Sequence, residues 1–303
     1  MEIVVIDNGS ENLDGIEIES RVPQVHWIPM AYNAGFARAS NEGMRRARAD
    51  VYLLLNPDTL AVDDSIEKCY HRLVASEYLA AGVQLLNEAG EPQISGSHFV
   101  KGGLNHLLPI PYWGGFIRWL GYASGSRVPG VRQAAAVQEV DWISGAFLMV
   151  KKEAVEKAGL MDEDFFLFGE EVEWCSRLRK FGKLCIFGDL KIVHLEGGSI
   201  NKEQDVPEKG YYNLFDKKGL QLMVSNHLRV RKQYGVFWFL FLLSNYSWGW
   251  FFYAFCGTVH RIFTWRDPRP EWKKMFLFGG NLLRLWALVP KILSGRPHFY
   301  KMF

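Results

Sequence analysis

One carboxylate, Asp58, comes directly after an apolar run, in the segment Asn56 to Thr59. The run, residues 51–55, has the length and composition of a central strand of a parallel sheet that is covered on both faces. Pro57 ends the strand because proline has no N–H to give to the ladder. Asp58 is therefore expected at the carboxyl end of a strand, where open α/β sheets bind ligands and an oxygen ligand can hold a divalent cation. The alternative role for Asp58 is a cap on the next helix.

Four more side chains with acid–base chemistry lie at the ends of predicted elements. Asp7 follows the first apolar run of the chain, and His194 ends a short predicted strand. Glu170 and Glu171 begin a predicted helix. Because such ends converge on one edge of an α/β sheet, we expect these four side chains to lie near Asp58.

Each of these residues also has a structural interpretation. Acidic residues in the first turn of a helix complement its dipole, and Glu173 can pair with Arg177 one turn later. A lone histidine at a strand end, such as His194, is more often structural than a metal ligand. Residue types and spacing leave both interpretations open.

The predicted elements before residue 90 alternate between strands and helices. Strands are expected at residues 3–6, 25–29, 51–55 and 80–85, and helices at 37–49 and 63–75. This rhythm predicts a doubly wound α/β layer. Residues 87–139 are rich in Gly and Pro without clear periodicity, so they are expected to be irregular. Further strands are expected at residues 140–150, 184–187 and 191–193, and helices at 152–158 and 170–181.

The C-terminal part of the chain differs in charge from the rest. Residues 226–303 contain twelve Lys and Arg and two acidic residues, so they carry +10 and leave −8 for residues 1–225. The sequence thus predicts a domain at residues 1–225 and a helical tail at 226–303. Because the tail is both basic and strongly apolar, it predicts an anionic membrane surface as the partner and no nucleic acid.

Residues 233–258 contain no charged side chain and many Phe, Trp and Tyr. The run is long enough to span a bilayer, but its polar interruptions and its Trp and Tyr favour an interfacial or re-entrant helical hairpin. A true span and an ordinary buried core are the alternatives. Residues 272–293 predict a basic amphipathic helix, and the alternative is a solvated helix of a small helical subdomain. The expected location is the cytoplasmic face of the cell membrane, since the start shows no cleaved secretion signal and the four cysteines are well separated.

Taken in chain order, these segments resemble the family 2 glycosyltransferases with the GT-A fold, especially their bacterial rhamnosyltransferase-like branch. The resemblance covers about residues 1–200. It is carried by Val5 to Ser10, Asn33 to Phe36 with Asn41 to Gly43, Leu55 to Thr59, Trp142 to Ala146, and Phe165 to Gly182 closed by His194, Gly197, Gly198 and Ser199. It implies a doubly wound mixed sheet of the GT-A type, and the aromatic, basic, membrane-associating helices predicted from composition follow it. The family usually has one more strand and helix before the segment that begins here at Met1, so this sheet is expected to lack a member.

The resemblance implies a donor site and a metal site. The nucleotide-sugar donor would be bound by Asp7, Asn33, Gly35, Asn56 and Asp58. Mg²⁺ or Mn²⁺ would be held by Asp58 and His194, and would neutralise the diphosphate leaving group. Asn56 stands where the family has a second acid.

The resemblance also implies a catalytic pair and an acceptor pocket. Glu170 and Glu171 match an acidic pair whose second member is the general base that takes a proton from the acceptor hydroxyl. Glu171 stands where the family has Asp. Trp142 and Gly145 fall where the family lines the sugar and acceptor pocket.

The function implied is an inverting, metal-dependent transfer of a sugar, rhamnose in the branch that the chain resembles. The donor would be dTDP- or UDP-linked, the acceptor a saccharide or a polyprenyl-linked saccharide, and the process the synthesis of cell-surface polysaccharide. One alternative is a non-catalytic relative that binds carbohydrate or membrane. A nucleotidyltransferase is disfavoured because no Gly-rich loop with a basic residue follows the first strand.

Overall fold

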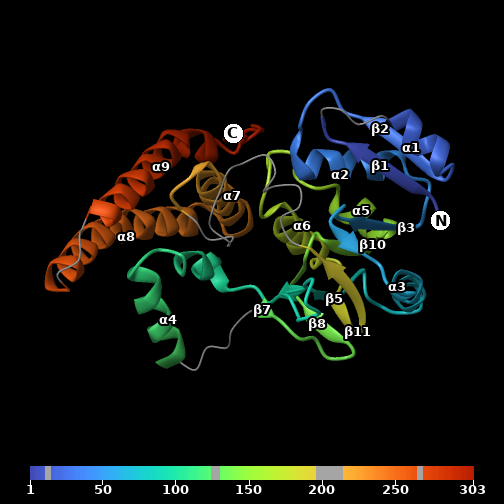
Figure 1. Ribbon diagram of the computed structural model, residues 1–303, viewed down its shortest axis with the longest axis horizontal. Coiled ribbons are helices and arrows are strands. Elements are labelled where there is room, and N and C mark those ends of the chain that lie inside the picture. Colours follow the sequence, from blue (N-terminus) through green and yellow to red (C-terminus); the bar gives the residue numbers. More distant parts are fainter. Residues whose placement is uncertain (11–14, 124–129, 196–213, 265–268) are drawn as a thin grey trace. The chain divides into compact units, whose positions relative to one another are not determined.

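The computed structural model describes residues 1–10, 15–123, 130–195, 214–264 and 269–303 (Figure 1). The chain divides into two compact units. The first consists of residues 1–99, 129–166 and 170–207, and the second of residues 100–128, 167–169 and 208–303.

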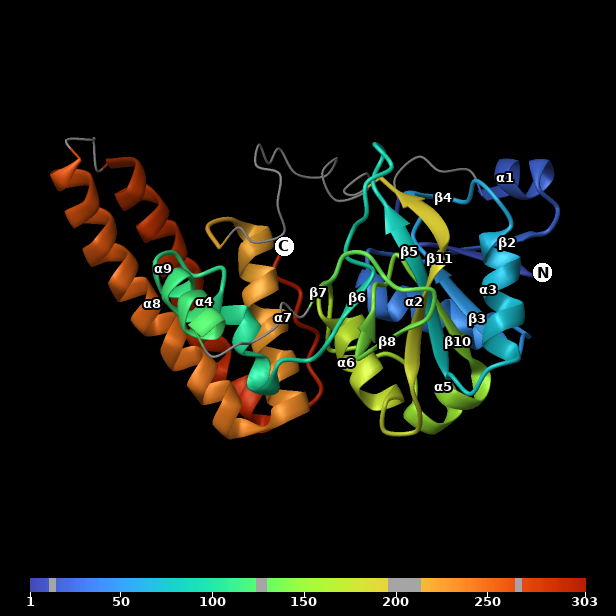
Figure 2. The same ribbon diagram turned by 90° about the horizontal axis from the view of Figure 1, so that it is seen from below.

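A mixed sheet is the centre of the first unit (Figure 2). Its strands, in the described part of the chain, are β3 (Val51–Leu55), β10 (Phe147–Lys151), β5 (Ala80–Leu86), β11 (Leu184–His194), β4 (Thr59–Leu60) and β8 (Gln138–Val140). The order is β3-β10-β5-β11-β4, and β8 also pairs with β11. β5 and β11 are parallel and the other pairs are antiparallel. The predicted mixed sheet is thus confirmed, and the two strands expected at 184–187 and 191–193 are one irregular strand, β11.

The position predicted for the strand at residues 51–55 is wrong. β3 lies at the end of the sheet and is antiparallel to β10, with Leu55 opposite Phe147. Only Tyr52 of β3 is buried, and Leu55 is 43% exposed. An apolar run identifies a strand, but the partner of β3 comes from much later in the chain, so no local pattern determines the pairing.

Two smaller sheets complete the first unit. β1 (Ile3–Asp7) and β2 (Val25–Pro29) pair in parallel and are joined through α1 (Gly15–Arg21). Among the described residues neither strand pairs with β3, so β1 and β2 form a sheet separate from the main one. The other small sheet contains β7 (Gly130–Val131), β6 (Gly96–Ser97) and β9 (Trp142–Ile143). The single strand expected at 140–150 is divided among the end of β8, β9 and β10, and residues 144–146 separate β9 from β10.

Helices cover both faces of the main sheet, and Figure 2 shows α3 on one side and α6 on the other. Along β10, Phe147 and Met149 belong to an apolar cluster with α3 (Ser65–Val74). Leu148 and Val150 point to the opposite face, where they join a cluster with α2 (Gly35–Arg46), α5 (Lys152–Ala158) and α6 (Glu170–Leu178). This alternation is the period of two expected for a strand. The doubly covered sheet that the alternating elements predicted is present.

The second unit is helical. Its elements are the 3₁₀ segment η1 (Lys101–Leu107), α4 (Trp113–Ala123), α7 (Lys217–Tyr234), α8 (Val236–Phe263) and α9 (Arg269–Ser294). The prediction that residues 87–139 are irregular is therefore wrong, since they contain η1, α4 and three short strands. This segment is ordered by contacts with residues far along the chain. Tyr246 donates a hydrogen bond to the His106 carbonyl at 2.9 Å, and a Cβ on Gly249 would lie 2.4 Å from Ile110. The boundary expected at residue 225 falls inside α7.

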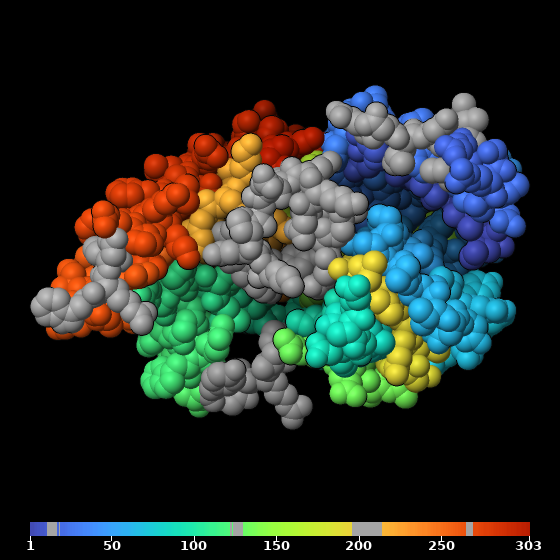
Figure 3. Space-filling model, viewed as in Figure 1, coloured from blue at the N-terminus to red at the C-terminus, as the bar shows by residue number. Residues whose placement is uncertain are grey.

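The charge-free run at residues 233–258 lies almost entirely in α8, a single helix of 28 residues. The hairpin predicted within this run is therefore wrong, because the chain reverses only after α8, and α9 packs back along it. Figure 3 shows α8 and α9, in orange and red, side by side. In the described part of the chain, α9 is the helix whose length and composition would let it cross a membrane, and 33% of its most apolar window is buried in the protein.

Candidate functional site

The end of β11 brings His194 to Asp58. β11 and β4 are antiparallel with His194 opposite Thr59, and Leu195 N donates to the Asp58 carbonyl at 2.9 Å. The His194 Nε2 atom is 3.4 Å from Asp58 Oδ1, and the two side chains are 9% and 14% exposed. Asp58 does not cap the next helix, because α3 begins at Ser65, whose N–H donates to Asp63. The structure thus brings together the two residues predicted as metal ligands.

The donor atoms of this pair fit a hard divalent cation. Adjacent ligands of an octahedral ion that each bind at about 2.1 Å are roughly 3 Å apart, and the observed separation of Nε2 and Oδ1 is 3.4 Å. The described residues contain no group of three or more His, Cys, Asp and Glu that could hold a metal. Two protein ligands leave the other positions to phosphate oxygens and water, which is how Mg²⁺ is commonly held.

Gln93 contacts His194 at two points and was not recognised from the sequence. Its Nε2 donates to the His194 carbonyl at 3.1 Å. Its Oε1 lies 3.1 Å from His194 Nδ1. No local pattern pointed to Gln93, since the two residues are 101 positions apart in the chain.

The turn between β9 and β10 connects the Asn56 segment with the start of α6. Asn56 N donates to the Ala146 carbonyl at 3.1 Å. A Cβ on Gly145 would lie 3.3 Å from the Phe36 ring and 3.8 Å from Glu171 Cβ. Gly145 and Glu171, predicted in acceptor and catalytic roles, are therefore neighbours, and a side chain at position 145 would press on the Phe36 ring.

The loops that follow β1 and β2 are joined by side-chain amides. Asn8 Nδ2 donates to Asn33 Oδ1 at 3.1 Å, and Asn8 Oδ1 accepts from Ala34 N at 2.8 Å. Asn33 Oδ1 also accepts from Gly35 N at 3.1 Å. Asp7 is buried, and its Oδ1 accepts from Ser10 N at 3.0 Å. Asp7, Asn33 and Gly35, predicted to bind the donor, thus belong to one ordered pair of loops, in which Asn8 is a member that the predicted set omitted.

Gly35 begins α2 in a conformation that only glycine adopts easily, with φ of +81°. A Cβ there would lie 2.2 Å from the Phe166 carbonyl oxygen. We expect Gly35→Ala to lower the free energy of unfolding by about 3 kcal/mol or more, because left-handed strain and overlap with the main chain act together. Urea denaturation checks this value.

Gly90 is the matched control for that substitution. Its φ is +78°, and a Cβ there meets nothing within 4 Å. Gly90→Ala is expected to cost only about 1 kcal/mol, from the strain alone. If Gly35→Ala and Gly90→Ala lower the free energy of unfolding equally, the contact with the Phe166 carbonyl does not contribute to the loss.

Glu170 and Glu171 occupy different environments at the start of α6. Glu170 is only 3% exposed, and its Oε2 has no hydrogen-bond partner among the described residues. Burial raises the pKa of the Glu170 carboxyl well above its usual range, and the adjacent charge of Glu171 raises it further. Glu171 is half-buried. Two acids whose surroundings differ in this way can take different roles, one protonated and one ionised.

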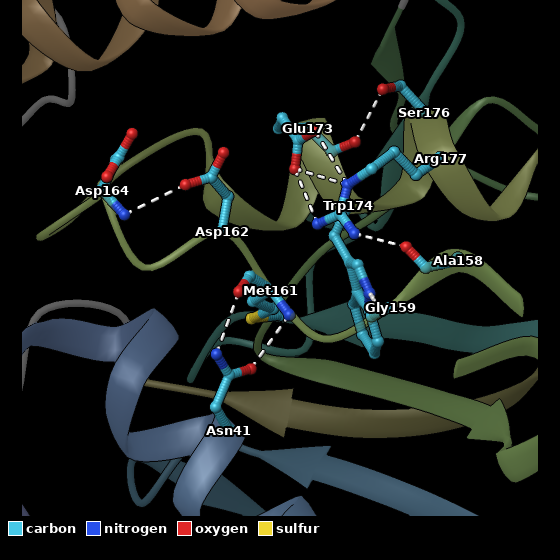
Figure 4. A network of polar contacts seen from close by, with 10 residues as sticks. All are labelled: Asn41, Ala158, Gly159, Met161, Asp162, Asp164, Glu173, Trp174, Ser176 and Arg177. Carbon is cyan, nitrogen blue, oxygen red and sulfur yellow. Dashed lines mark hydrogen bonds and ion pairs between the residues drawn. The ribbon is translucent and has the colours of Figure 1, made fainter. Parts of the chain in front are cut away.

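The rest of α6 is fixed by polar contacts that are structural (Figure 4). Arg177 Nε donates to Glu173 at 2.9 and 3.0 Å, and Nη1 donates to the Ala158 carbonyl at 2.6 Å. The Trp174 indole donates to the Gly159 carbonyl at 2.8 Å. The structural interpretation of Glu173 is confirmed, and these contacts hold α6 against the end of α5.

Asn41 joins α2 to the segment that leads into α6 (Figure 4). Its Nδ2 donates to the Met161 carbonyl and its Oδ1 accepts from Met161 N, both at 2.9 Å. This closed pair of hydrogen bonds makes buried Asn41 a structural residue. Trp142, predicted to line the acceptor pocket, lies on β9 and packs partly buried against the apolar cluster of α2, α5 and α6.

Comparison with known proteins supplies the family context. Residues 1–122 match the family model described as glycosyl transferase family 2. The low-salt glycan biosynthesis hexosyltransferase Agl10 of Haloferax volcanii is 26% identical over 183 residues, which are 59% of this chain and 53% of the relative. The dTDP-rhamnosyl transferase RfbF of Shigella flexneri is 27% identical over 246 residues, which are 75% of this chain and 72% of the relative.

A third relative comes from Mycobacterium tuberculosis. It is an N-acetylglucosaminyl-diphospho-decaprenol L-rhamnosyltransferase, 24% identical over 221 residues, which are 67% of this chain and 69% of the relative. The chain spans about half the length of the Haloferax relative and about 70% of the other two.

Proposed function

Because the chain belongs to glycosyl transferase family 2, we propose that it transfers a hexose from a nucleotide-diphosphate donor to a saccharide or lipid-linked acceptor, on a GT-A-type fold and with inversion at the anomeric carbon. Rhamnose from dTDP-rhamnose is the first sugar to test, since two relatives are named as rhamnosyltransferases. The lipid-linked acceptor is supported by the name of the mycobacterial relative. The process served is the synthesis of cell-surface polysaccharide.

The pair formed by Asp58 and His194 carries this proposal. Two side chains that suit a divalent cation lie 3.4 Å apart at strand ends of one sheet, where α/β folds bind phosphorylated ligands. Mg²⁺ or Mn²⁺ bound by these two residues would neutralise the charge that develops on the diphosphate. Asp7, Asn33 and Gly35 would orient the nucleotide, and Asn56 would contact the donor beside Asp58.

Glu171 would take the proton from the acceptor hydroxyl as that oxygen attacks the anomeric carbon. Its neighbour Glu170 is buried, which raises the pKa of that carboxyl and favours its protonated form, so the half-buried Glu171 is the member of the pair that we assign as the base. Gly145 and Trp142 would line the pocket for the sugar and the acceptor.

The direct test is a transfer assay with the whole chain. The protein is incubated with dTDP-rhamnose or UDP-hexoses, Mn²⁺ or Mg²⁺, and an N-acetylglucosaminyl-diphospho-polyprenol acceptor. Products are identified by mass spectrometry, and the anomeric configuration by NMR. Transfer with inverted configuration supports the proposal. Binding of donor without transfer would instead favour a non-catalytic relative, and retained configuration would contradict the inverting mechanism.

The helical unit presents an aromatic surface that fits a membrane. Ten apolar side chains on α8 are 40% or more exposed, and at 100° per residue seven of them lie together on one face of the helix. This set, the aromatic stripe, consists of Phe237, Phe241, Trp248, Phe251, Phe252, Phe255 and Ile262. A groove joins the stripe to Phe276, Leu283 and Trp286 of α9. Monomeric soluble proteins rarely expose an apolar patch of this extent.

Charge indicates which surface the aromatic stripe meets. Lys273, Arg284 and Lys291 are exposed and are spaced 11 and 7 residues apart, so they form a line along α9. Residues 226–303 carry +10 in total. Basic side chains beside exposed aromatic ones suit the anionic cytoplasmic face of the cell membrane. We infer that the aromatic stripe rests on that face.

Removing part of the stripe should release the protein from lipid. We expect the triple variant Trp248→Ser, Phe251→Ser, Phe255→Ser to bind anionic liposomes at least about 100-fold more weakly, because each buried aromatic side chain contributes about 1.5–3 kcal/mol. Co-sedimentation with phosphatidylserine vesicles measures the partition. The control is Tyr70→Ser, Val74→Ser, Phe181→Ser, which removes side chains of 44–50% exposure from the first unit. Unchanged partition of the α8 variant would contradict membrane contact by this face.

A further inference from the structure

The side chain of Gln93 is oriented by the main chain of His194. A carbonyl oxygen only accepts hydrogen bonds, so the atom of Gln93 that lies 3.1 Å from the His194 carbonyl must be the amide nitrogen. The amide oxygen of Gln93 then faces His194 Nδ1, at 3.1 Å. The contact to the carbonyl therefore settles which end of the amide meets the ring.

This orientation determines where His194 carries its proton. The amide oxygen is only an acceptor, so Nδ1 must be the donor. In the neutral imidazole, Nε2 then has a lone pair and no hydrogen. Nε2 faces Asp58 Oδ1, a second acceptor, at 3.4 Å. Two acceptors that face each other in a mostly buried place form a suitable pair of ligands for a cation.

Gln93 is itself held by buried neighbours. Its N–H donates to the Leu85 carbonyl at 2.9 Å. Its carbonyl accepts from Gln84 Nε2 at 3.1 Å and from Ser95 Oγ at 3.3 Å. Gln84 and Ser95 are 3% and 1% exposed. The main chain of Gln93 is thus fixed to the end of β5, the parallel neighbour of β11, and its amide reaches His194 from a rigid support.

We propose that Gln93 is a positioning residue that keeps His194 protonated on Nδ1 and so reserves Nε2, together with Asp58, for a divalent cation. The role toward a metal rests on the proposed function, whereas the control of the tautomer does not. Without an acceptor at Nδ1, the proton can move to Nε2 and donate to Asp58. Both ligand atoms would then be occupied by one hydrogen bond. Groups that orient a metal-binding histidine typically affect metal affinity by about 10- to 100-fold.

Two readouts test this proposal in the whole protein. The first is ¹⁵N NMR of the His194 ring in metal-free protein at a pH where the ring is neutral. The second is calorimetric titration of Mn²⁺ with dTDP present. In Gln93→Leu we expect the Nε2-protonated form to appear and Mn²⁺ to bind about 10- to 100-fold more weakly. In Gln93→Glu the carboxylate still accepts from Nδ1, so the wild-type tautomer should be kept. Gln133→Leu, at an exposed position, is the matched control and should behave as wild type.

The outcomes separate the two proposals. If Gln93→Leu keeps the Nδ1-protonated ring, or if Gln93→Glu loses it, the positioning role is wrong, whatever the protein binds. If wild type binds no Mn²⁺ with dTDP while the tautomer changes as expected, the role of Gln93 stands for the ring and the proposed metal-dependent function fails. If the Nε2-protonated form of His194 appears in Gln93→Leu but the affinity for Mn²⁺ changes less than twofold, the role of Gln93 toward the cation is contradicted.

Discussion

Replacing Glu171 by glutamine is expected to lower kcat by about 10²- to 10⁴-fold, the usual contribution of a general base. Glutamine has nearly the same size and cannot take a proton, and the KM for the donor should stay close to the wild-type value. Gly145 lies beside Glu171 and is unchanged by the substitution. Steady-state kinetics with dTDP-rhamnose and a lipid-linked acceptor measures the effect.

Two further variants make that result specific. Glu153→Gln, on the exposed side of α5, should leave kcat unchanged. Glu170→Gln should lower kcat much less than Glu171→Gln, because burial raises the pKa of Glu170 and favours its neutral form, which the amide preserves. If Glu170→Gln is the more damaging of the two, the assignment of the base to Glu171 is wrong.

Replacing Asp58 by asparagine is expected to lower kcat/KM by about 10³-fold or more, since a bound cation supplies several kcal/mol of transition-state stabilisation and each tenfold change is 1.36 kcal/mol. The amide keeps the shape of the side chain but loses the charge that faces His194. Calorimetry should show that Mn²⁺ no longer binds with dTDP. Chelation of the metal by EDTA should inactivate the wild type, and added Mn²⁺ should restore it.

The control for charge is Asp64→Asn. The Asp64 side chain is 54% exposed, and its Oδ1 lies 2.8 Å from Lys68 Nζ in an ion pair. Exposed ion pairs of this kind contribute little to stability, so the activity of Asp64→Asn should remain within about twofold of the wild-type value. Activity of Asp58→Asn that is equal to the wild type and still stimulated by Mn²⁺ would refute the assignment of Asp58 as a metal ligand.

Local patterns predicted the elements well where they act over a few residues. β2 at 25–29, β3 at 51–55 and α5 at 152–158 have the bounds expected from apolar runs and stop signals. The same reasoning recognised that Asp58 follows a strand and that Glu170 begins a helix. It failed for residues 87–139, whose helix α4 combines Trp, Phe and Gly without a clear period. Such a segment becomes ordered through its partners, here the neighbouring η1 and α8.

The sequence by itself determined the strand ends and the residue types that they present, because apolar runs, proline and glycine act on the backbone nearby. Only the tertiary structure decided which strands are neighbours and what surrounds each acid. It paired β3 with β10 in place of a parallel strand, and it buried Glu170 while Glu171 stayed half-buried. It also set Gln93 against His194, 101 residues away, through the parallel pairing of β5 with β11. Contacts over such distances depend on the whole sheet, so no short stretch of sequence contains them.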